Sequence, residues 1–359
     1  MTGVYIHIPF CRKICSYCDY CKVFYHPKWS HDYLIKLKDE IEDYYDGRLI
    51  DTIYIGGGTP SVLNDKELDY LFFLVSNFKT TKNFELTFEC NLEDITENLL
   101  AILKNNGVNR LSIGIQSFQE HKLFLMGRNH EYEDAFDKIK LCRSFGFQNI
   151  NLDLIYGFKD ETIDDLEEDL DLFISLKPEH ISTYSLIINK NTLLDLNGIT
   201  TIDEDLDSEM YELIQSRFSF RMKQYEVSNF AKKGYASRHN LRYWNNEEYF
   251  GFGISASGYI DGIRYTNTKN LSTYLKGEVK RDVTILSEKD KIDYALMLGL
   301  RKTEGINIRD LEEQYQINLK TEYPIEALIK NKQLMEKKGM LFINPGMIYV
   351  MNEILIKLL

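Results

Sequence analysis

The alternation of short β-rich apolar runs with longer stretches of helical period most limits the folds open to this 359-residue chain. Six such runs occur, at residues 4–8, 52–56, 84–89, 110–115, 150–155 and 180–188. Between them lie helix candidates at residues 33–45, 66–76, 96–105, 132–145 and 162–176. A helix between two strands returns the chain to the edge where the first strand began. Strands joined in this way therefore run parallel, and their crossovers are right-handed. Because six units are too few for a closed eight-stranded barrel, the pattern predicts an α/β fold with an open or partial (β/α)6 barrel.

Chemically unusual residues follow these runs, where the carboxyl ends of the strands should meet. In parallel α/β folds the chemistry lies at that edge. Four cysteines follow the first run, GGGTP follows the second, Glu89 ends the third, Gln116 follows the fourth, and Asp153 lies near the end of the fifth. The sequence therefore predicts one site at the mouth of the barrel.

The cysteine loop has the spacing Cys11-x3-Cys15-x2-Cys18-x2-Cys21. Thiolates bind iron-sulfur clusters, and three ligands on a [4Fe–4S] cluster leave one iron open to chelate S-adenosylmethionine. Zinc suits four cysteines this close together poorly. A closed four-cysteine electron-transfer cluster, with Cys21 as the fourth ligand, stays open on the loop alone.

Polar residues at the other strand ends favour the open cluster. Three consecutive glycines allow backbone to approach a ligand closely, and their amides can hold a charged group. A closed electron-transfer cluster needs neither these glycines nor the polar side chains that should face the same mouth of the barrel. Those side chains are Glu89, Gln116, Arg128 and Asp153.

Charge and hydropathy exclude several classes of function. The net charge is -12, and eight of the twelve residues from 160 to 171 are acidic, which disfavours nucleic-acid binding. We interpret that stretch as the solvated N-terminal turn of a helix. No run of 18 apolar residues and no basic leader followed by a hydrophobic segment occurs, so we expect a cytoplasmic protein that does not span a membrane.

The pattern changes after residue 190, first to irregular aromatic and polar segments and then to helices. We expect a barrel core at 1–190, an extension of the barrel at 191–286, and a small, mostly helical, winged-helix-like domain at 287–359.

Motifs in consistent order along nearly the whole chain carry a family resemblance. They are YIHIPFCRKICSYCDY, YIGGGTPS, the Glu of FECN, GIQSF, GRNH, NLDLIYG, RHNLRYW, FGFGISASG and MLGLRKTEGI. With these the chain resembles the radical-SAM family that contains oxygen-independent coproporphyrinogen III oxidase and the heme chaperone HemW. The resemblance implies cluster ligation by Cys11, Cys15 and Cys18. It also implies contacts to S-adenosylmethionine from Tyr5, Tyr17, Gly57, Gly58, Thr59, Glu89, Gln116, Arg128, Asp153 and, by position only, Ile187.

Three features resemble the chaperone branch more than the oxidase. The oxidase has a long segment ahead of its cysteine loop, whereas here the loop follows the first run. The oxidase also looks like CxxxCxxCxC, whereas Asp19 and Tyr20 follow the third cysteine here and Cys21 fits neither pattern. The third feature is the HNxxYW motif associated with heme binding, formed by His239, Asn240, Tyr243 and Trp244.

On the residues alone, His239 either ligates heme iron or forms a structured turn beside core aromatics. The resemblance implies heme as a ligand and heme-accepting proteins as partners. Peripheral contact with membrane-bound acceptors and a homodimer stay open. The alternatives are oxidative decarboxylation of a tetrapyrrole propionate, a heme-degrading radical methyltransferase, and a closed-cluster electron carrier.

Overall fold

Six parallel strands form the centre of the computed structural model, which describes residues 1–279 and 281–359. Their order in the sheet is their order in the chain, and each pairs in parallel with the next. This confirms the predicted partial barrel. The strands are β1 (Thr2–Ile8), β4 (Ile50–Gly57), β5 (Thr80–Asn91), β6 (Arg110–Gln116), β7 (Ile150–Tyr156) and β8 (His180–Ser185).

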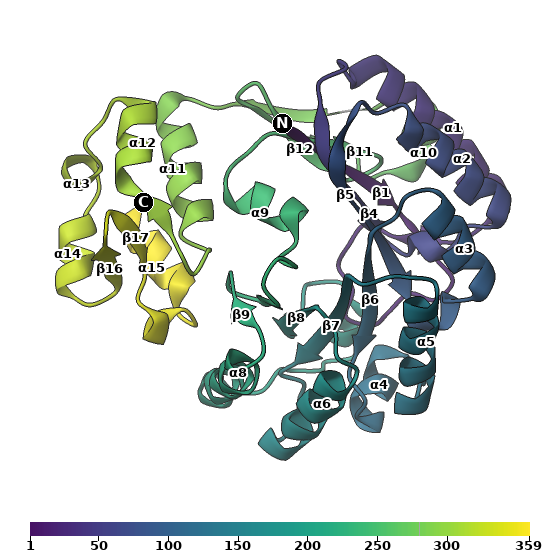
Figure 1. The fold of residues 1–359 in the computed structure, drawn as a ribbon, viewed down its shortest axis with the longest axis horizontal. Helices are drawn as coiled ribbons and strands as arrows, with labels where there is room; N and C mark the ends of the chain where they lie inside the picture. The colour runs from purple at the N-terminus through teal and green to yellow at the C-terminus, as the bar shows by residue number, and fades with distance from the viewer. Residues whose placement is uncertain (280) are drawn as a thin grey trace.

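Helices cover the outer side of this curved sheet (Figure 1). They are α1 (Pro27–Tyr44), α2 (Asp65–Ser76), α3 (Glu97–Asn105), α4 (Glu120–Met126), α5 (Tyr132–Ser144) and α6 (Ile163–Ser175). The helices begin where the sequence supplies side-chain caps. Asn64 and Glu67 form a capping box at the start of α2, and Thr96 caps α3. Because helices pack on one face and polar groups fill the other, the strands are buried almost throughout.

The chain after β8 adds strands to both edges of the same sheet. One edge gains β11 (Tyr249–Phe252), which runs parallel to β1, and then antiparallel β12 (Ser257–Ile260), β13 (Ile263–Asn267) and β14 (Arg281–Ile285). The other edge gains β10 (Asn229–Ala231) and β9 (Lys223–Gln224). The accompanying helices are α7 (Leu193–Leu196), α8 (Glu204–Ser219), α9 (Arg238–Trp244) and α10 (Leu271–Leu275).

The C-terminal part forms a lobe beside the barrel, coloured light green to yellow in Figure 1. Its helices are α11 (Glu288–Gly299), α12 (Ile308–Tyr315), α13 (Leu319–Glu322), α14 (Ile325–Lys330) and α15 (Met351–Leu358). A separate three-stranded sheet has the order β15 (Ile306–Asn307), β17 (Met340–Ile343) and β16 (Leu334–Lys337). Among the described residues no helix is long and apolar enough to cross a membrane.

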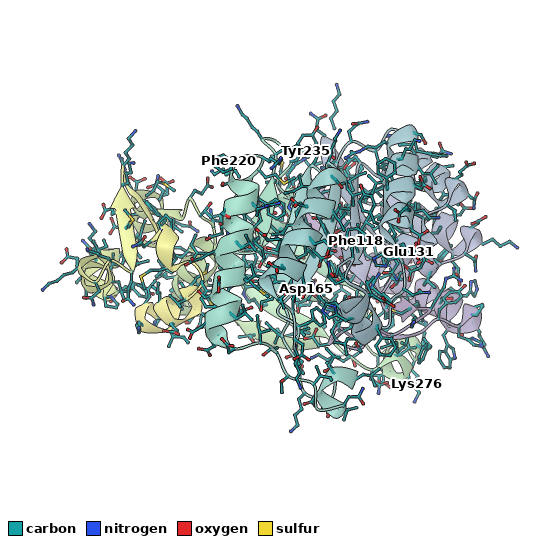
Figure 2. The ribbon with its side chains drawn as sticks, turned by 90° about the horizontal axis from the view of Figure 1, so that it is seen from below. Phe118, Glu131, Asp165, Phe220, Tyr235 and Lys276 are labelled. Carbon is teal, nitrogen blue, oxygen red and sulfur yellow. The ribbon has the colours of Figure 1, made fainter. Side chains whose placement is uncertain are left out.

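The acidic stretch before and within α6 is only partly solvated, which corrects our interpretation of it. Thr162 and Asp165 form the expected capping box, and Asp165 is labelled in Figure 2. Glu161 and Asp169, however, are fully buried and accept hydrogen bonds from Lys122 Nζ at 2.6 and 2.7 Å. A buried ammonium group offsets the desolvation of both carboxylates. Neither position is distinguishable from its exposed neighbours by charge alone.

Candidate cofactor site

The cysteine loop connects β2 (Phe10–Cys11) to β3 (Val23–Phe24) at the mouth of the barrel. Neighbouring elements hold it from two sides. The Ser16 hydroxyl donates to the Leu125 carbonyl of α4, and Leu194 N of α7 donates to the Ser16 carbonyl at 3.2 Å. On the other side His7 Nε2 donates to the Cys21 carbonyl at 2.8 Å. The loop is therefore fixed at its middle and at its end.

Three of the four loop cysteines face one cavity of about 660 Å³, namely Cys11, Cys15 and Cys18. Burial raises the pKa of Cys11 to about 11 and also raises the pKa of Cys18, so both are thiols until a metal displaces the proton. Cys21 does not line this cavity. Its Sγ donates to the Lys269 carbonyl at 3.4 Å, in the segment between β13 and α10. Three of the four loop cysteines, rather than all four, thus line a common cavity.

Among the described residues, no three His, Cys, Asp or Glu side chains converge closely enough to hold a single metal ion. In a [4Fe–4S] cluster each cysteine binds a different iron, so the sulfurs stand apart around a larger object. Cys11, Cys15 and Cys18, which line the same cavity, would hold such a cluster with one iron left without a protein ligand.

Gly56, Gly57 and Gly58, which we call the glycine shelf, lie directly against the cysteine loop. A Cβ on Gly58 would lie 2.7 Å from the Pro9 carbonyl carbon and 3.0 Å from Cys11 Sγ. Gly57 has a φ of +119°, and a Cβ there would lie 2.7 Å from the His7 ring. Only glycine fits either position, because a side chain would displace backbone or a buried ring. The shelf can therefore hold a small ligand against the cluster.

Glu89 lies beneath this shelf at the end of β5. Its carboxylate accepts hydrogen bonds from the Tyr54 hydroxyl at 2.6 Å and from Gly57 N at 3.0 Å. Burial raises the pKa of Glu89 to about 7, partly offset by the Tyr54 hydrogen bond, and the nearby Asp153 raises it further. An ammonium or sulfonium ligand would restore the ionised form. The site therefore favours a cationic ligand.

A chain of hydrogen bonds joins three strand ends to the cysteine loop. Arg128 donates to the Gly114 carbonyl and to Asn91 Oδ1, both at 3.0 Å. Asn91 donates to Thr59 Oγ1 at 3.2 Å, and Thr59 in turn donates to Cys11 Sγ at 3.5 Å. The chain fixes the guanidinium and the first cysteine relative to each other.

The remaining expected S-adenosylmethionine contacts line the same cavity. Gln116 ends β6 with a φ of +79°, and Asp153 accepts a hydrogen bond from Asn151 at 2.8 Å. Tyr17 lies beside Arg128 in the cavity wall, and both side chains are half-buried. Ile187 is at the rim and is 71% exposed. The structure thus brings all ten expected positions to one cavity, with Tyr5, Gly57, Gly58, Thr59, Glu89 and Arg128 among them.

The HNxxYW motif forms α9, on the inner side of the barrel wall (Figure 1). His239 is buried, and both of its ring nitrogens are hydrogen-bonded, to Thr52 Oγ1 at 2.9 Å and to the Tyr243 hydroxyl at 2.8 Å. Burial, together with Arg242 and Arg110, lowers the pKa of His239 to about 3. His239 is thus hydrogen-bonded beside aromatic residues, in a helix rather than in a turn, and it reaches an iron atom only by giving up one of these bonds.

A second cavity, of about 360 Å³, adjoins the first along this motif. Tyr5, Tyr20 and Tyr243 line both cavities. Trp244 lines only the second cavity, whereas His239 and Asn240 line only the first. The motif therefore separates a cavity suited to the cluster and its small ligand from a cavity with aromatic walls.

Three residues that hold other side chains of the site in place were not predicted from the sequence. Tyr54 and Asn91 hold Glu89 and Arg128, and His7 holds both Cys21 and Tyr5 through its two ring nitrogens. A signal was available for all three. Tyr54 and His7 lie within strands at alternate positions to other site residues. Asn91 follows Glu89 by two residues and so faces the same side of β5.

Comparison with known proteins identifies the class of protein to which this chain belongs. Residues 5–173 match the Radical SAM superfamily. Coproporphyrinogen III oxidase (HemN) from Escherichia coli superposes with a TM-score of 0.88 over 99% of this chain and 89% of its own, at 22% identity, which shows a common fold. The fold and the cysteine, glycine and carboxylate positions define a radical-SAM protein with a [4Fe–4S] cluster and S-adenosylmethionine as cofactors.

Curated relatives place the chain more narrowly. The heme chaperone HemW of Bacillus subtilis is 36% identical over 98% of this chain and 96% of its own length. HemW of Escherichia coli is 35% identical over 78% of each. The chain belongs to the HemW family.

Proposed function

We propose that this protein binds heme and hands it to heme-accepting proteins in the cytoplasm, and that its cluster and S-adenosylmethionine control the transfer. The relatives that match along the full chain are heme chaperones by name. The observation that carries the proposal within this chain is the aromatic second cavity, which meets the cofactor cavity along HNxxYW. A ligand in the second cavity would contact the same tyrosines that line the first.

The proposal assigns distinct roles within the motif. Tyr243 and Trp244 would pack on the porphyrin face, because aromatic rings bind flat apolar surfaces at little entropic cost. His239 and Asn240 would support them from the first cavity, since the His239 ring is held by Thr52 and holds the Tyr243 hydroxyl.

We propose a different function for each of the three regions expected from the sequence. Residues 1–190 would hold the cofactors, and residues 191–286, whose strands extend both edges of the barrel sheet, would supply the heme contacts. Residues 287–359, with a sheet of their own, are the region we propose for contact with acceptors, including membrane-bound ones, or with a second copy. All six cysteines are free, which suits a reducing compartment.

The experiment is a heme titration of the anaerobically reconstituted protein, followed by Soret absorbance. We expect saturation at a fixed heme-to-protein ratio and loss of heme to an added heme-free b-type apocytochrome. Trp244→Leu should weaken binding, because it removes a wall of the second cavity. Trp29→Leu is the matched control, since the chain has two tryptophans and Trp29 lies exposed on α1.

The absence of a saturable Soret change would contradict heme binding. Conversion of coproporphyrinogen III to protoporphyrinogen IX by the same preparation would instead assign the oxidase reaction. Equal loss of affinity in Trp244→Leu and Trp29→Leu would remove the second cavity from the proposal while leaving heme binding in place.

A further inference from the structure

Two residues that line the second cavity each carry a buried N–H donor without a hydrogen-bond partner. They are Arg264 Nε, on β13, and Trp244 Nε1, at the end of α9. An unpaired buried donor is costly, and most such groups in folded proteins are hydrogen-bonded. Two of them on one small cavity indicate that the cavity takes a ligand with acceptor oxygens.

The Arg264 guanidinium is held in place but not neutralised. It lies over the rings of Tyr259 and Tyr294, at 4.5 and 4.0 Å from their centroids, and its NH2 group donates to Asn246 Oδ1 at 2.6 Å. Tyr249 is also hydrogen-bonded to Arg264, and none of these four partners carries a negative charge. The ordered cation is therefore available to an anion from the cavity.

The other charged groups around this cavity do not offset that preference. Glu247 is the carboxylate on its wall, and it pairs with Arg242 at 2.7 Å. His7 contributes no charge: its Nε2 donates to the Cys21 carbonyl, its Nδ1 accepts from Tyr5, and burial lowers its pKa to about 4. Ser255 and Ser257 also line this cavity and carry no charge.

We propose that Arg264 and Trp244 form a carboxylate-binding site that takes a propionate side chain of the heme. This rests on the proposed function, because heme supplies both the flat ring that suits the aromatic wall and the carboxylate that the two donors lack. A planar guanidinium is suited to bidentate contact with a carboxylate, and the indole N–H adds a third donor.

The test compares heme with its dimethyl ester, whose propionates carry no charge. It uses the reconstituted full chain with Trp29→Phe, so that the remaining tryptophan emission comes from Trp244. Heme is expected to quench this emission with at least about tenfold higher affinity than the ester, since hydrogen bonds to charged groups are the strong ones. Arg264→Gln should reduce that preference to near equality, whereas Arg264→Lys should keep part of it.

Arg301→Gln is the matched control. The Arg301 guanidinium lies 5.7 Å from the same indole ring but donates to Asn352 and does not line the cavity, so the preference for heme should survive. Equal affinity of the unsubstituted protein for heme and the ester overturns the propionate site whether or not any variant folds. Saturable Soret binding with that equality would leave the proposed function standing, and no Soret binding would overturn both.

Discussion

The four cysteines of the loop differ in what their sulfur atoms face. Cys11, Cys15 and Cys18 line the cofactor cavity, whereas Cys21 Sγ is engaged with the Lys269 carbonyl. We therefore expect Cys11→Ala, Cys15→Ala and Cys18→Ala each to abolish cluster assembly, and Cys21→Ala to retain most of the iron. Iron and sulfide content after anaerobic reconstitution measures this. A Cys21→Ala protein as poor in iron as the other three would make Cys21 a ligand.

Glu89 makes the binding of S-adenosylmethionine depend on pH. Its pKa is raised to about 7, so it loses its negative charge as the pH falls through neutrality. A cationic ligand prefers the ionised form, and we expect its affinity to rise between about pH 6 and 8 and to level off above. Equilibrium binding across this range, compared with Glu89→Gln, measures the effect. Parallel pH profiles for the two proteins would show that another group is responsible.

The sequence predicted residues that line the cofactor cavity, but not the residues that hold them in place. Cysteine spacing, triple glycine and single polar residues at strand ends are visible in one dimension because each is chemically unusual there. Asn91 and Tyr54 act through contacts with residues 37 and 35 positions away along the chain. Such pairs become visible only when the register of the parallel strands is known.

Between elements, the buried group of Lys122, Glu161 and Asp169 ties α4 to α6 and to the loop after β7. Lys122→Met should destabilise the fold by about 3–5 kcal/mol, because it leaves two buried carboxylates without their counter-ion. Urea unfolding measures the loss. Lys289→Met is the control: it breaks an exposed pair with Asp293, and we expect less than about 1 kcal/mol. Similar losses in both variants would contradict a structural role for the buried group.

Local sequence patterns determine helices and strands but not the pairing of strands that are distant in the chain. Apolar period and capping residues located the six central strands and five helices of the barrel, because these signals are local. The first helix begins at Pro27, six residues before the predicted start, and the short helix α4 was not predicted. The long final run ended at Ser185 rather than residue 188. The parallel pairing of β11 with β1 was not predicted, since it joins segments almost 250 residues apart. Local periodicity carries no information about such pairing.

The two main parts of the molecule meet at Glu226, which lies between the barrel and the C-terminal lobe. It forms a β-bridge with Lys302 and is buried, and burial raises the pKa of its carboxyl to about 7 from an ordinary value of 4.5. The folded state therefore binds a proton that the unfolded state releases, so this group's contribution to stability falls as the pH rises from about 4.5 to 7. Above pH 7 the loss is complete.

Glu226→Gln removes that dependence. We expect its free energy of unfolding, relative to the unsubstituted protein, to increase by roughly 2–3 kcal/mol between pH 5 and pH 8. Denaturant unfolding at several pH values measures the difference, and using the difference cancels the contribution of Glu89. A constant difference across this range would contradict the assignment.

The central claim is that three cysteines of this chain hold a cluster whose fourth iron accepts S-adenosylmethionine. Electron paramagnetic resonance of the reduced, reconstituted protein tests it most directly, with and without S-adenosylmethionine. We predict that the cofactor changes the g-values of the cluster signal. An identical signal in both samples would contradict the account, because a cluster enclosed by four protein ligands has no iron free to respond.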